Sequence, residues 1–403
     1  MRFMQIGSAR DEASYRCCCR ARKVFVHYLI IPIMPQLTLL FTFLVSAVLT
    51  AFVIPKIILI SFKKRLFDFA DERKVHKGIV PRLGGVAFTP VITITVALTV
   101  GLVSLFSTPA ENQMYVSHSA HLALGLSALV ILYMEGVTDD LIGVGYKAKF
   151  LTQLVCAVMI ICTGAWIDNL HGLFGVTTLP AAVGMPLTAV LVVFIINAIN
   201  LIDGIDGLAS GLSGIALFFL GCLYGVCREW AFAVLAFATL GTLVPFFIYN
   251  VFGRAEVGRK IFMGDCGSQT IGLIIGTLAV NFCMIDGVVA DLSLTPLVVV
   301  FSLLMVPCLD VIRVMFGRIS RHRNPFMPDK THIHHKFLAL GMSHRTAMVT
   351  ILFVAAFFAL LNLGLMTLLD INLILLLDVV IWTLMHLWLT RTIRRRASMQ
   401  VED

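Results

Sequence analysis

Long apolar runs, interrupted by short polar segments, make up most of this chain. Eleven of these runs approach the length of about 20 apolar residues that a helix needs to cross a bilayer. They lie at residues 37–60, 83–106, 119–138, 149–167, 185–202, 207–227, 231–251, 267–285, 295–315, 347–369 and 371–390. The runs are continuous, whereas a strand of a lipid-facing barrel alternates apolar and polar residues. The pattern predicts an all-α, polytopic membrane protein with about eleven transmembrane helices.

The composition and the distribution of charge agree with this prediction. Of the 403 residues, 59% are hydrophobic and 13% are charged, whereas soluble domains carry roughly 25% charged residues. Lys and Arg gather in alternate connections, at 61–82, 139–149, 252–266, 316–346 and 391–403, and the other connections between runs hold only Arg228. Because short cytoplasmic loops retain basic residues, we expect an external N-terminus and a cytoplasmic C-terminus. The net charge of +8 fits this topology, and no nucleic-acid partner is expected.

The first 33 residues do not fit this topology. They hold six basic residues and the run Cys17-Cys18-Cys19, although eleven spans would place them outside the membrane. A signal peptide matches Val24 to Met34 poorly, so our hypothesis is that translation starts at Met34 and that 1–33 is an upstream extension. Residues 34–396 are expected to form a single transmembrane domain, followed by a cytoplasmic tail at 397–403.

A pair of carboxylates ends the third run on the predicted cytoplasmic side. Burying Asp139 or Asp140 in hydrocarbon would cost several kcal/mol unless the charge is paired or bound to a metal. Lys147 and Lys149 follow in the same short connection. A solvated loop end would explain one Asp, but carboxylates beside ammonium groups suit a site for phosphates and a divalent cation.

Four polar side chains follow one another at three-residue intervals: Asn197, Asn200, Asp203 and Asp206. Gly204 and Gly207 predict that the helix ends here and that a tight turn follows. Such a turn can gather several of these groups around one ligand. An ordinary Asp-Gly turn between helices would leave Asn197 and Asn200 unexplained inside an apolar helix.

The segment Phe262 to Ser268 joins a basic loop to the next run and contains Asp265. Mg²⁺ normally takes one or two protein carboxylates, together with phosphate oxygens and waters. Asp265 is therefore the first candidate ligand, with an Asn or Asp of 197–206 as the second. Alternatively, Asp265 caps the following helix. Phe262 either packs at the interface or stacks on a nucleobase.

Two further clusters lie in the basic connections. His332, His334 and His335 are accompanied by Arg318, Arg321, Arg323, Lys330 and Lys336. The surrounding cations disfavour zinc, so a pocket for an anionic, sugar-bearing group is the preferred interpretation over a solvated basic loop. The other cluster consists of Arg73, Lys74, His76, Lys77 and Arg82, before the turn-forming Gly84-Gly85, and part of it is simply positive-inside charge.

Taken in order, these motifs closely resemble the polyprenyl-phosphate N-acetylhexosamine-1-phosphate transferases, over about residues 37–390. The forms His332-Ile-His-His335 and Pro81-Arg-Leu-Gly-Gly85 are more similar to the undecaprenyl-phosphate N-acetylglucosamine-1-phosphate branch than to the muramoyl-pentapeptide branch. Cys266 and Glu135 depart from the usual pattern without removing a motif residue.

This resemblance implies transfer of N-acetylhexosamine-1-phosphate from a UDP-sugar to undecaprenyl phosphate, on the cytoplasmic face of a bacterial inner membrane. It implies Mg²⁺, with Mn²⁺ as a substitute, held by Asp265 and Asn200. Expected catalytic residues are Asp139, Asp140, Lys149, His332, His334 and His335, with Lys149 on the diphosphate and Asp139 near the lipid phosphate as a base. Expected substrate-binding residues are Arg73, Lys74, His76, Asn197, Asp203, Asp206, Phe262, Arg323 and Lys336, with Asp206 and Phe262 around uracil.

Two other functions compete with this one, and two properties stay open. A transporter would hold its acidic groups near the bilayer midplane, whereas these clusters lie at the predicted cytoplasmic ends. A CDP-alcohol phosphotransferase requires an Ala-Arg pair after its first Asp-Gly, which Asp203-Gly204 lacks. The pattern leaves open which amino sugar is transferred and whether the protein forms a homodimer.

Overall fold

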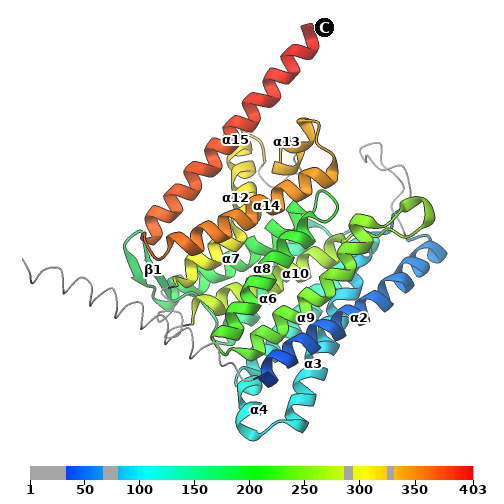
Figure 1. Cartoon of the computed structure of the whole chain (residues 1–403), viewed down its shortest axis with the longest axis vertical. Helices are drawn as coiled ribbons and strands as arrows, with labels where there is room; N and C mark the ends of the chain where they lie inside the picture. The colour runs from blue at the N-terminus through cyan, green and yellow to red at the C-terminus, as the bar shows by residue number, and fades with distance from the viewer. Residues whose placement is uncertain (1–32, 67–79, 286–293, 325–330, 403) are drawn as a thin grey trace, which may run out of the picture.

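The computed structural model of the protein describes residues 33–66, 80–285, 294–324 and 331–402. Nearly all of the expected extension 1–33 lies outside these ranges. The long helices are α2 (Ile33–Lys64), α3 (Phe88–Phe106), α5 (Ser119–Ile142), α6 (Tyr146–Cys162), α7 (Ala181–Ile202), α8 (Leu208–Val226), α9 (Trp230–Phe247), α10 (Gly264–Cys283), α12 (Pro296–Ile319), α14 (His344–Leu365) and α15 (Ile371–Glu402). They form one helical bundle (Figure 1).

Short elements lie in the connections between these helices. They are η1 (Gly84–Ala87), α4 (Pro109–Val116), η2 (Ile248–Phe252), η3 (Ala255–Val257), α13 (Ile333–Ala339) and the strands β1 (Asn169–Leu173) and β2 (Val176–Thr178). The two strands pair antiparallel as a hairpin, which the apolar pattern did not predict. The predicted span 149–167 is wrong at its end, because α6 stops at Cys162 and Gly164 follows with a φ of +95°.

Ten of the described helices are long and apolar enough to cross a membrane. The eleventh expected span is α6, whose 17 residues lie at the lower limit of about 17–25 for a spanning helix. The prediction of an all-α, polytopic membrane protein is confirmed.

Helix α10 lies at the centre of the bundle. Every residue from Cys266 to Cys283 is buried, whereas α2, α5 and α15 bury less than a third of their most apolar segments. Small residues let helix backbones approach closely in membranes. At Gly272 a Cβ atom would come within 2.7 Å of the Ile196 Cα atom of α7. Close packing therefore fixes the first turn of this central helix, and with it the position of any side chain on that turn.

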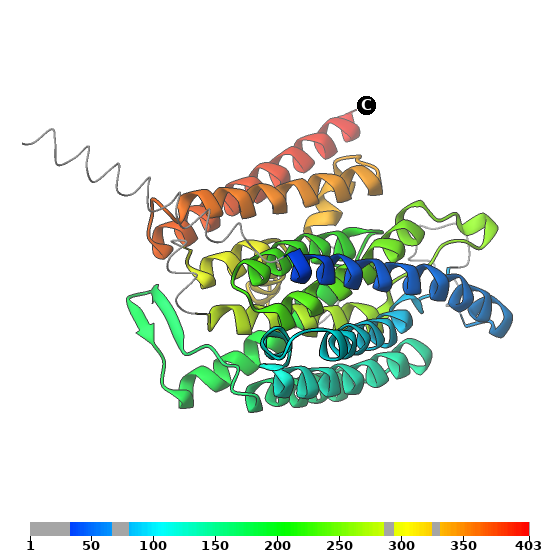
Figure 2. The same ribbon diagram turned by 60° about the horizontal axis from the view of Figure 1, so that its bottom comes forward.

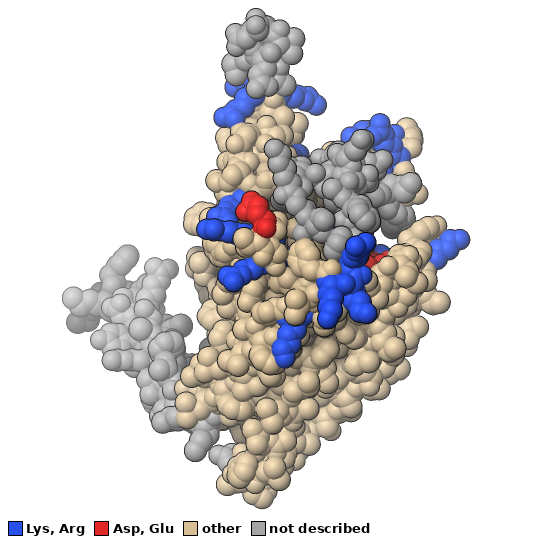
Figure 3. All heavy atoms as spheres, turned by 90° about the vertical axis from the view of Figure 1, so that its right-hand side faces the viewer, with Lys and Arg blue, Asp and Glu red and all other residues tan. Residues whose placement is uncertain are grey.

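The two ends of the bundle differ in what they carry. Helix α13 and the loop between α9 and α10 lie at one end, and the β1–β2 hairpin and α4 lie at the other (Figures 1 and 2). On the face shown in Figure 3, Lys and Arg gather in the upper half, whereas the lower half is almost free of charged side chains.

Candidate active site

Asp140 holds the N-terminus of α10 from the last turn of α5. Its two carboxylate oxygens accept hydrogen bonds from the backbone N–H groups of Asp265, at 2.8 Å, and Cys266, at 3.0 Å. These N–H groups have no partner within their own helix, and a carboxylate there also stabilises the helix dipole. Asp140 therefore performs the capping that the sequence allowed for Asp265. The Asp265 side chain is left free for other contacts.

The segment 81–85 fixes the other side of this helix start. The Phe262 N–H donates to the Pro81 carbonyl at 2.8 Å, and the N–H groups of Gly84 and Gly85 donate to the carbonyls of Phe262 and Met263. A Cβ atom at Gly85 would overlap the backbone of Gly267 in α10. Gly84 begins a short 3₁₀ turn, as predicted, and the second glycine is required by this close backbone approach.

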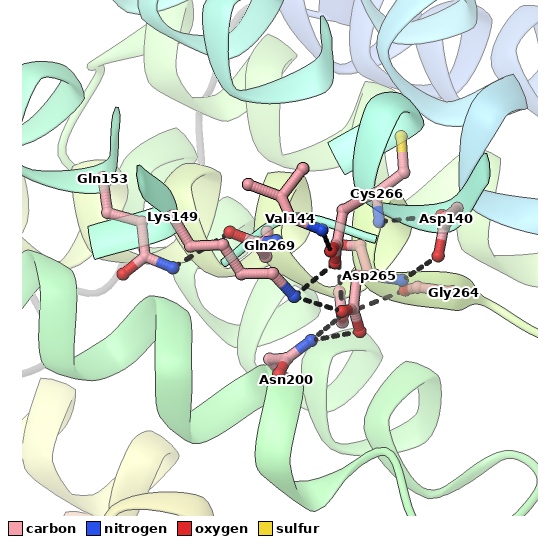
Figure 4. A network of polar contacts seen from close by, with 11 residues as sticks. Asp140, Val144, Lys149, Gln153, Asn200, Gly264, Asp265, Cys266 and Gln269 are labelled. Carbon is pink, nitrogen blue, oxygen red and sulfur yellow. Dashed lines mark hydrogen bonds and ion pairs between the residues drawn. The ribbon is translucent and has the colours of Figure 1, made fainter. Parts of the chain in front are cut away.

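The side chains of four helices meet in what we call the carboxylate centre. Figure 4 shows Asp140 of α5, Lys149 of α6, Asn200 of α7 and Asp265 of α10, and Asp139 of α5 belongs to it through its pair with Lys149. Lys149 Nζ lies 2.8 Å from Asp265 Oδ2 and also pairs with Asp139. Asn200 donates to Asp265 Oδ1 at 2.9 Å and to Ser268 Oγ at 2.8 Å. Asp139 also accepts from the Val144 N–H at 2.7 Å. The structure thus joins residues that lie up to 126 positions apart.

The two carboxylates that pair with Lys149 differ in solvent exposure. The Asp139 side chain is 6% exposed, whereas the Asp265 side chain is 40% exposed. Both carboxylates have partners on both oxygens, Asp139 from Lys149 and Val144 and Asp265 from Lys149 and Asn200, so exposure is what distinguishes them. Asp265 is therefore the carboxylate of this pair that a ligand can reach.

The turn between α7 and α8 brings further negative charge to the same place. Helix α7 ends at Ile202 and Gly207 has a φ of +78°, as the glycines predicted. Burial, and then the charges of Asp206, Asp265 and Asp140, raise the pKa of Asp203 to about 7. Each of these carboxylates disfavours the ionisation of the others. A bound cation would remove this electrostatic penalty.

Asp206 is paired within the same region. Its carboxylate lies 2.5 Å from Lys260 Nζ, and that ammonium lies 5.7 Å from the centre of the Phe262 ring. Asn250 fixes the turn by accepting from the Gly207 N–H at 2.6 Å and donating to the Ile261 carbonyl at 2.9 Å. The two residues expected around uracil, Asp206 and Phe262, are thus linked through Lys260, which belongs to none of the predicted motifs.

Asn197 lies one helical turn before Asn200 and has different partners. It donates to Gln153 at 2.7 Å, and Gln153 donates to Gln269 at 2.9 Å. Gln153 and Gln269 were missed, although two amides within apolar spans are themselves a signal of a polar contact. This row of amides ties α7, α6 and α10 together behind the carboxylate centre.

The histidine cluster, residues 332–335, is held by a buried carboxylate of α12. Asp310 is fully buried and lies 2.9 Å from His332 Nδ1. It also accepts from the Ile333 N–H and from Arg313, whose guanidinium donates to the Thr331 carbonyl at 2.6 Å. Asp310 and Arg313 were missed, although both fall in the predicted span 295–315, where ionisable residues are costly and usually functional.

His334 reaches the turn that carries Asp203. A Cβ atom at Gly204 would overlap Nε2 and Cε1 of the His334 ring. The His335 ring is 4.2 Å from that of His334. Burial and His335 lower the pKa of His334 to about 3, so its imidazole is neutral at physiological pH.

The remaining expected residues are distributed differently. The Lys336 ammonium contacts α15, at His386 and Thr390. Arg323 follows α12 and its side chain is exposed. Arg73, Lys74 and His76 lie outside the described residues.

A divalent cation could use only part of this centre. Within the described ranges, no three His, Cys, Asp or Glu side chains are arranged as a metal-binding group. Mg²⁺ is satisfied by one or two carboxylates when substrate phosphates and waters complete its shell. The exposed Asp265 carboxylate beside the Asn200 amide meets that requirement.

Fold and site together define a multi-pass membrane protein with a carboxylate and lysine centre at one end of its helices. The model of glycosyl transferase family 4 matches residues 122–283, which include the whole carboxylate centre. Over 319 residues the chain is 31% identical to a Bacillus subtilis (strain 168) protein named "Probable undecaprenyl-phosphate N-acetylglucosaminyl 1-phosphate transferase", covering 79% of this chain and 82% of the relative. The chain therefore belongs to the polyprenyl-phosphate N-acetylglucosamine-1-phosphate transferases of glycosyl transferase family 4.

Two other relatives extend this comparison. A Mycolicibacterium smegmatis protein named decaprenyl-phosphate N-acetylglucosaminephosphotransferase is 32% identical over 327 residues, or 76% of this chain and 77% of that protein. A Yersinia pestis protein named undecaprenyl-phosphate alpha-N-acetylglucosaminyl 1-phosphate transferase is 28% identical over 305 residues, or 75% of this chain and 78% of that protein. The family expected from the motifs is confirmed.

Proposed function

We propose that this protein transfers N-acetylglucosamine-1-phosphate from UDP-N-acetylglucosamine to a polyprenyl phosphate, with undecaprenyl phosphate as the acceptor. The active site faces the cytoplasm at the bacterial inner membrane, and the product starts a cell-envelope glycan. The observation that carries this proposal is the meeting of Asp139, Lys149, Asn200 and Asp265 at one end of the bundle. The names of the relatives support the acceptor class and the amino sugar.

Asp265 and Asn200 would hold Mg²⁺, or Mn²⁺ in its place. When bound, the ion would neutralise phosphate charge, which is the main demand of phosphoryl transfer. The Asp265 carboxylate is accessible and already aligned by Asn200. Asp140 supports this site indirectly, because it fixes the backbone from which Asp265 projects.

The chain's own cation in this centre is Lys149. Its ammonium pairs with Asp139 and Asp265, and we assign it the role of neutralising the diphosphate of the donor. We assign Asp139 the role of orienting Lys149. A phosphate monoester is already largely ionised at neutral pH, since its second pKa is about 6, and so the acceptor needs no strong base.

In this reaction an oxygen of the polyprenyl phosphate forms a bond to the β-phosphorus of the UDP-sugar. The bond from that phosphorus to the oxygen bridging to the α-phosphorus breaks, and UMP leaves with the electron pair. We assign Asp206 and Phe262 to the uracil end and the neutral His334, with His335, to the sugar-phosphate end. His334 touches the turn at Gly204, which keeps this end beside Asp203.

The competing functions gain no such support. A transport site would lie near the middle of the helices, whereas Asp139, Asn200 and Asp265 lie at or next to helix ends. The relatives named above are transferases for a sugar phosphate and carry no name of a transporter or a CDP-alcohol enzyme.

The direct test incubates the purified full-length protein with undecaprenyl phosphate and each of a panel of radiolabelled UDP-sugars, with and without Mg²⁺. We expect a labelled lipid and stoichiometric UMP from UDP-N-acetylglucosamine, and loss of both products in EDTA. Labelled lipid only from a different UDP-sugar would overturn the donor, and full activity in EDTA would overturn the metal.

A further inference from the structure

The last helix, α15, has a polar stripe on the side that faces the protein. Asp378, Trp382, His386 and Thr390 recur every four residues and so share one face of the helix. The first three are buried, at 1%, 4% and 5% exposure. Apolar side chains such as Leu376 and Leu384 are more than half exposed on the other side. A membrane helix with its polar residues turned inward is built for specific contacts with the protein.

The first residue of this stripe, Asp378, ties α15 to α14 and, through Asn362, to α12. Asn362 of α14 donates to Asp378 Oδ2 at 2.7 Å and to Ser302 Oγ of α12 at 2.9 Å. All three side chains are buried, and ionisable residues within a membrane usually mark functional positions. This contact fixes the position of α15 along the bundle.

The C-terminal part of the stripe contacts α13. Lys336 Nζ lies 3.2 Å from His386 Nδ1 and 2.9 Å from Thr390 Oγ1. Arg396 of α15 donates a hydrogen bond to the carbonyl of Leu340, just after the end of α13. Helix α13 is therefore held at two points by α15, in addition to its start at Asp310.

The two functional faces of α13 point in different directions. Residues two positions apart on an α-helix are about 200° apart around its axis. His334 packs against Gly204, and Lys336 contacts α15 on another side of the helix. Lys336 was expected to bind substrate, but its position suits an anchor.

We propose that α15 acts as a strap that positions the histidines of α13, and that Lys336 is a positioning residue whose partners are His386 and Thr390. The effect of the strap on catalysis rests on the proposed function. The contacts by which α15 holds α13 do not, and they can be tested without a substrate.

The first experiment measures amide hydrogen exchange in the full-length protein, with Thr390→Val as the test variant. Valine keeps the shape of threonine and removes the hydroxyl that Lys336 contacts. Thr392→Val is the matched control, because both hydroxyls also bond to a carbonyl of their own helix. We expect faster exchange of residues 333–339 in Thr390→Val alone. Equal exchange in the two variants would overturn the strap.

The second experiment is a double-mutant cycle between Lys336→Met and Thr390→Val, read as kcat and KM for the UDP-sugar. Loss of a hydrogen bond to a charged group changes an equilibrium constant by roughly tenfold. We therefore expect the KM to be about tenfold higher in either single variant. If the two residues act through one contact, the double variant should be no worse than Lys336→Met. Multiplicative losses, or a defect in Lys336→Met alone, would assign Lys336 to the substrate and refute the positioning role.

These two experiments separate the strap from the proposed function. Faster exchange in Thr390→Val, with no sugar-phosphate transfer by the wild-type protein, would support the strap and refute the function. Normal transfer by the wild-type protein, with unchanged exchange in Thr390→Val, would support the function and refute the strap.

Discussion

The carboxylate centre and the histidine segment 331–340 lie at the same end of the molecule but are held in different ways. The carboxylate centre is built from the ends of core helices, and its charged groups contact one another directly. The histidine segment is held by contacts with Asp310 of α12 and with α15. His334 faces the turn at Gly204, and its Nδ1 atom is buried without a hydrogen-bond partner among the described residues.

This difference indicates a division of labour between the two regions. The groups that we assign to neutralising phosphate charge are arranged around the start of the most buried helix, α10, so their geometry is rigid. The groups assigned to the sugar-phosphate lie on a seven-residue helix, α13, whose position depends on contacts made on its far sides. Changes in the first region should remove catalysis, and changes behind the second should weaken donor binding.

The largest effect is expected for Asp265→Asn, which removes one negative charge from the carboxylate centre and keeps its size. Removing one preorganised electrostatic group typically lowers kcat by 10²–10³-fold, and we expect a loss on the order of 10³-fold because both Lys149 and the metal depend on this residue. The assay is the rate of UMP release by purified protein. Asp370→Asn, at the start of α15, is the matched control because, among the described residues, the Asp370 side chain accepts hydrogen bonds only from nearby backbone N–H groups. A rate within twofold of the control would remove Asp265 from the reaction.

A smaller effect is expected for Asp310→Asn. This variant weakens the contacts to His332 and Arg313, and each bond to a charged group is worth about 1.5–3 kcal/mol. We expect the KM for the UDP-sugar to rise by roughly 10–100-fold, while the Mg²⁺ concentration for half-maximal rate stays unchanged. A parallel shift in the Mg²⁺ requirement would show that the two regions are not independent.

Gly204→Ala probes the contact between His334 and the turn that carries Asp203. The added methyl group would overlap the buried His334 ring, and such overpacking usually costs about 1–3 kcal/mol. We expect a roughly tenfold higher KM for the donor and little change in kcat. Gly214→Ala on the adjacent helix is the control, because its methyl group would meet only Leu240, at 3.8 Å. Equal kinetics in the two variants would argue against a role for the His334 contact.

The smallest effect concerns stability and pH. The pKa of Asp203 is raised from its ordinary value of 3.8 to about 7, so the folded protein retains a proton that the unfolded chain loses. The free energy of unfolding therefore falls as the pH rises between these two pKa values, and this penalty is complete above pH 7. Asp203→Asn removes the penalty. Thermal midpoints of the variant and the wild type are compared in EDTA. The difference between them should increase by a few degrees from about pH 5 to pH 8. A difference that does not vary with pH would contradict this account.

The fold and the motif clusters could be predicted because each depends on local sequence. Apolar runs of spanning length identify membrane helices, and the glycines at 204 and 207 predicted the end of α7. The meeting of Asp139, Asn200 and Asp265 was foreseen from the predicted sidedness of the connections. That sidedness itself, with an external N-terminus, remains a prediction.

The contacts that position these groups could not be predicted, because they join distant segments. Nothing local indicates that Asp140 caps α10 rather than binding substrate, or that His332 bonds to Asp310. Lys336 was grouped with the histidines by its position in the sequence, yet its partners come from α15, 50 and 54 residues later. The hairpin β1–β2 was missed because its strands have five and three residues and no alternating pattern.

The most direct test of the central claim is metal binding itself, measured with Mn²⁺ as a paramagnetic substitute for Mg²⁺. Electron paramagnetic resonance of the purified protein with UDP-N-acetylglucosamine would report bound Mn²⁺ in the wild type, in Asp310→Asn and in Asp265→Asn. We predict equal binding in the wild type and Asp310→Asn, and its loss in Asp265→Asn. Unchanged Mn²⁺ binding in Asp265→Asn would contradict a metal site at the carboxylate centre.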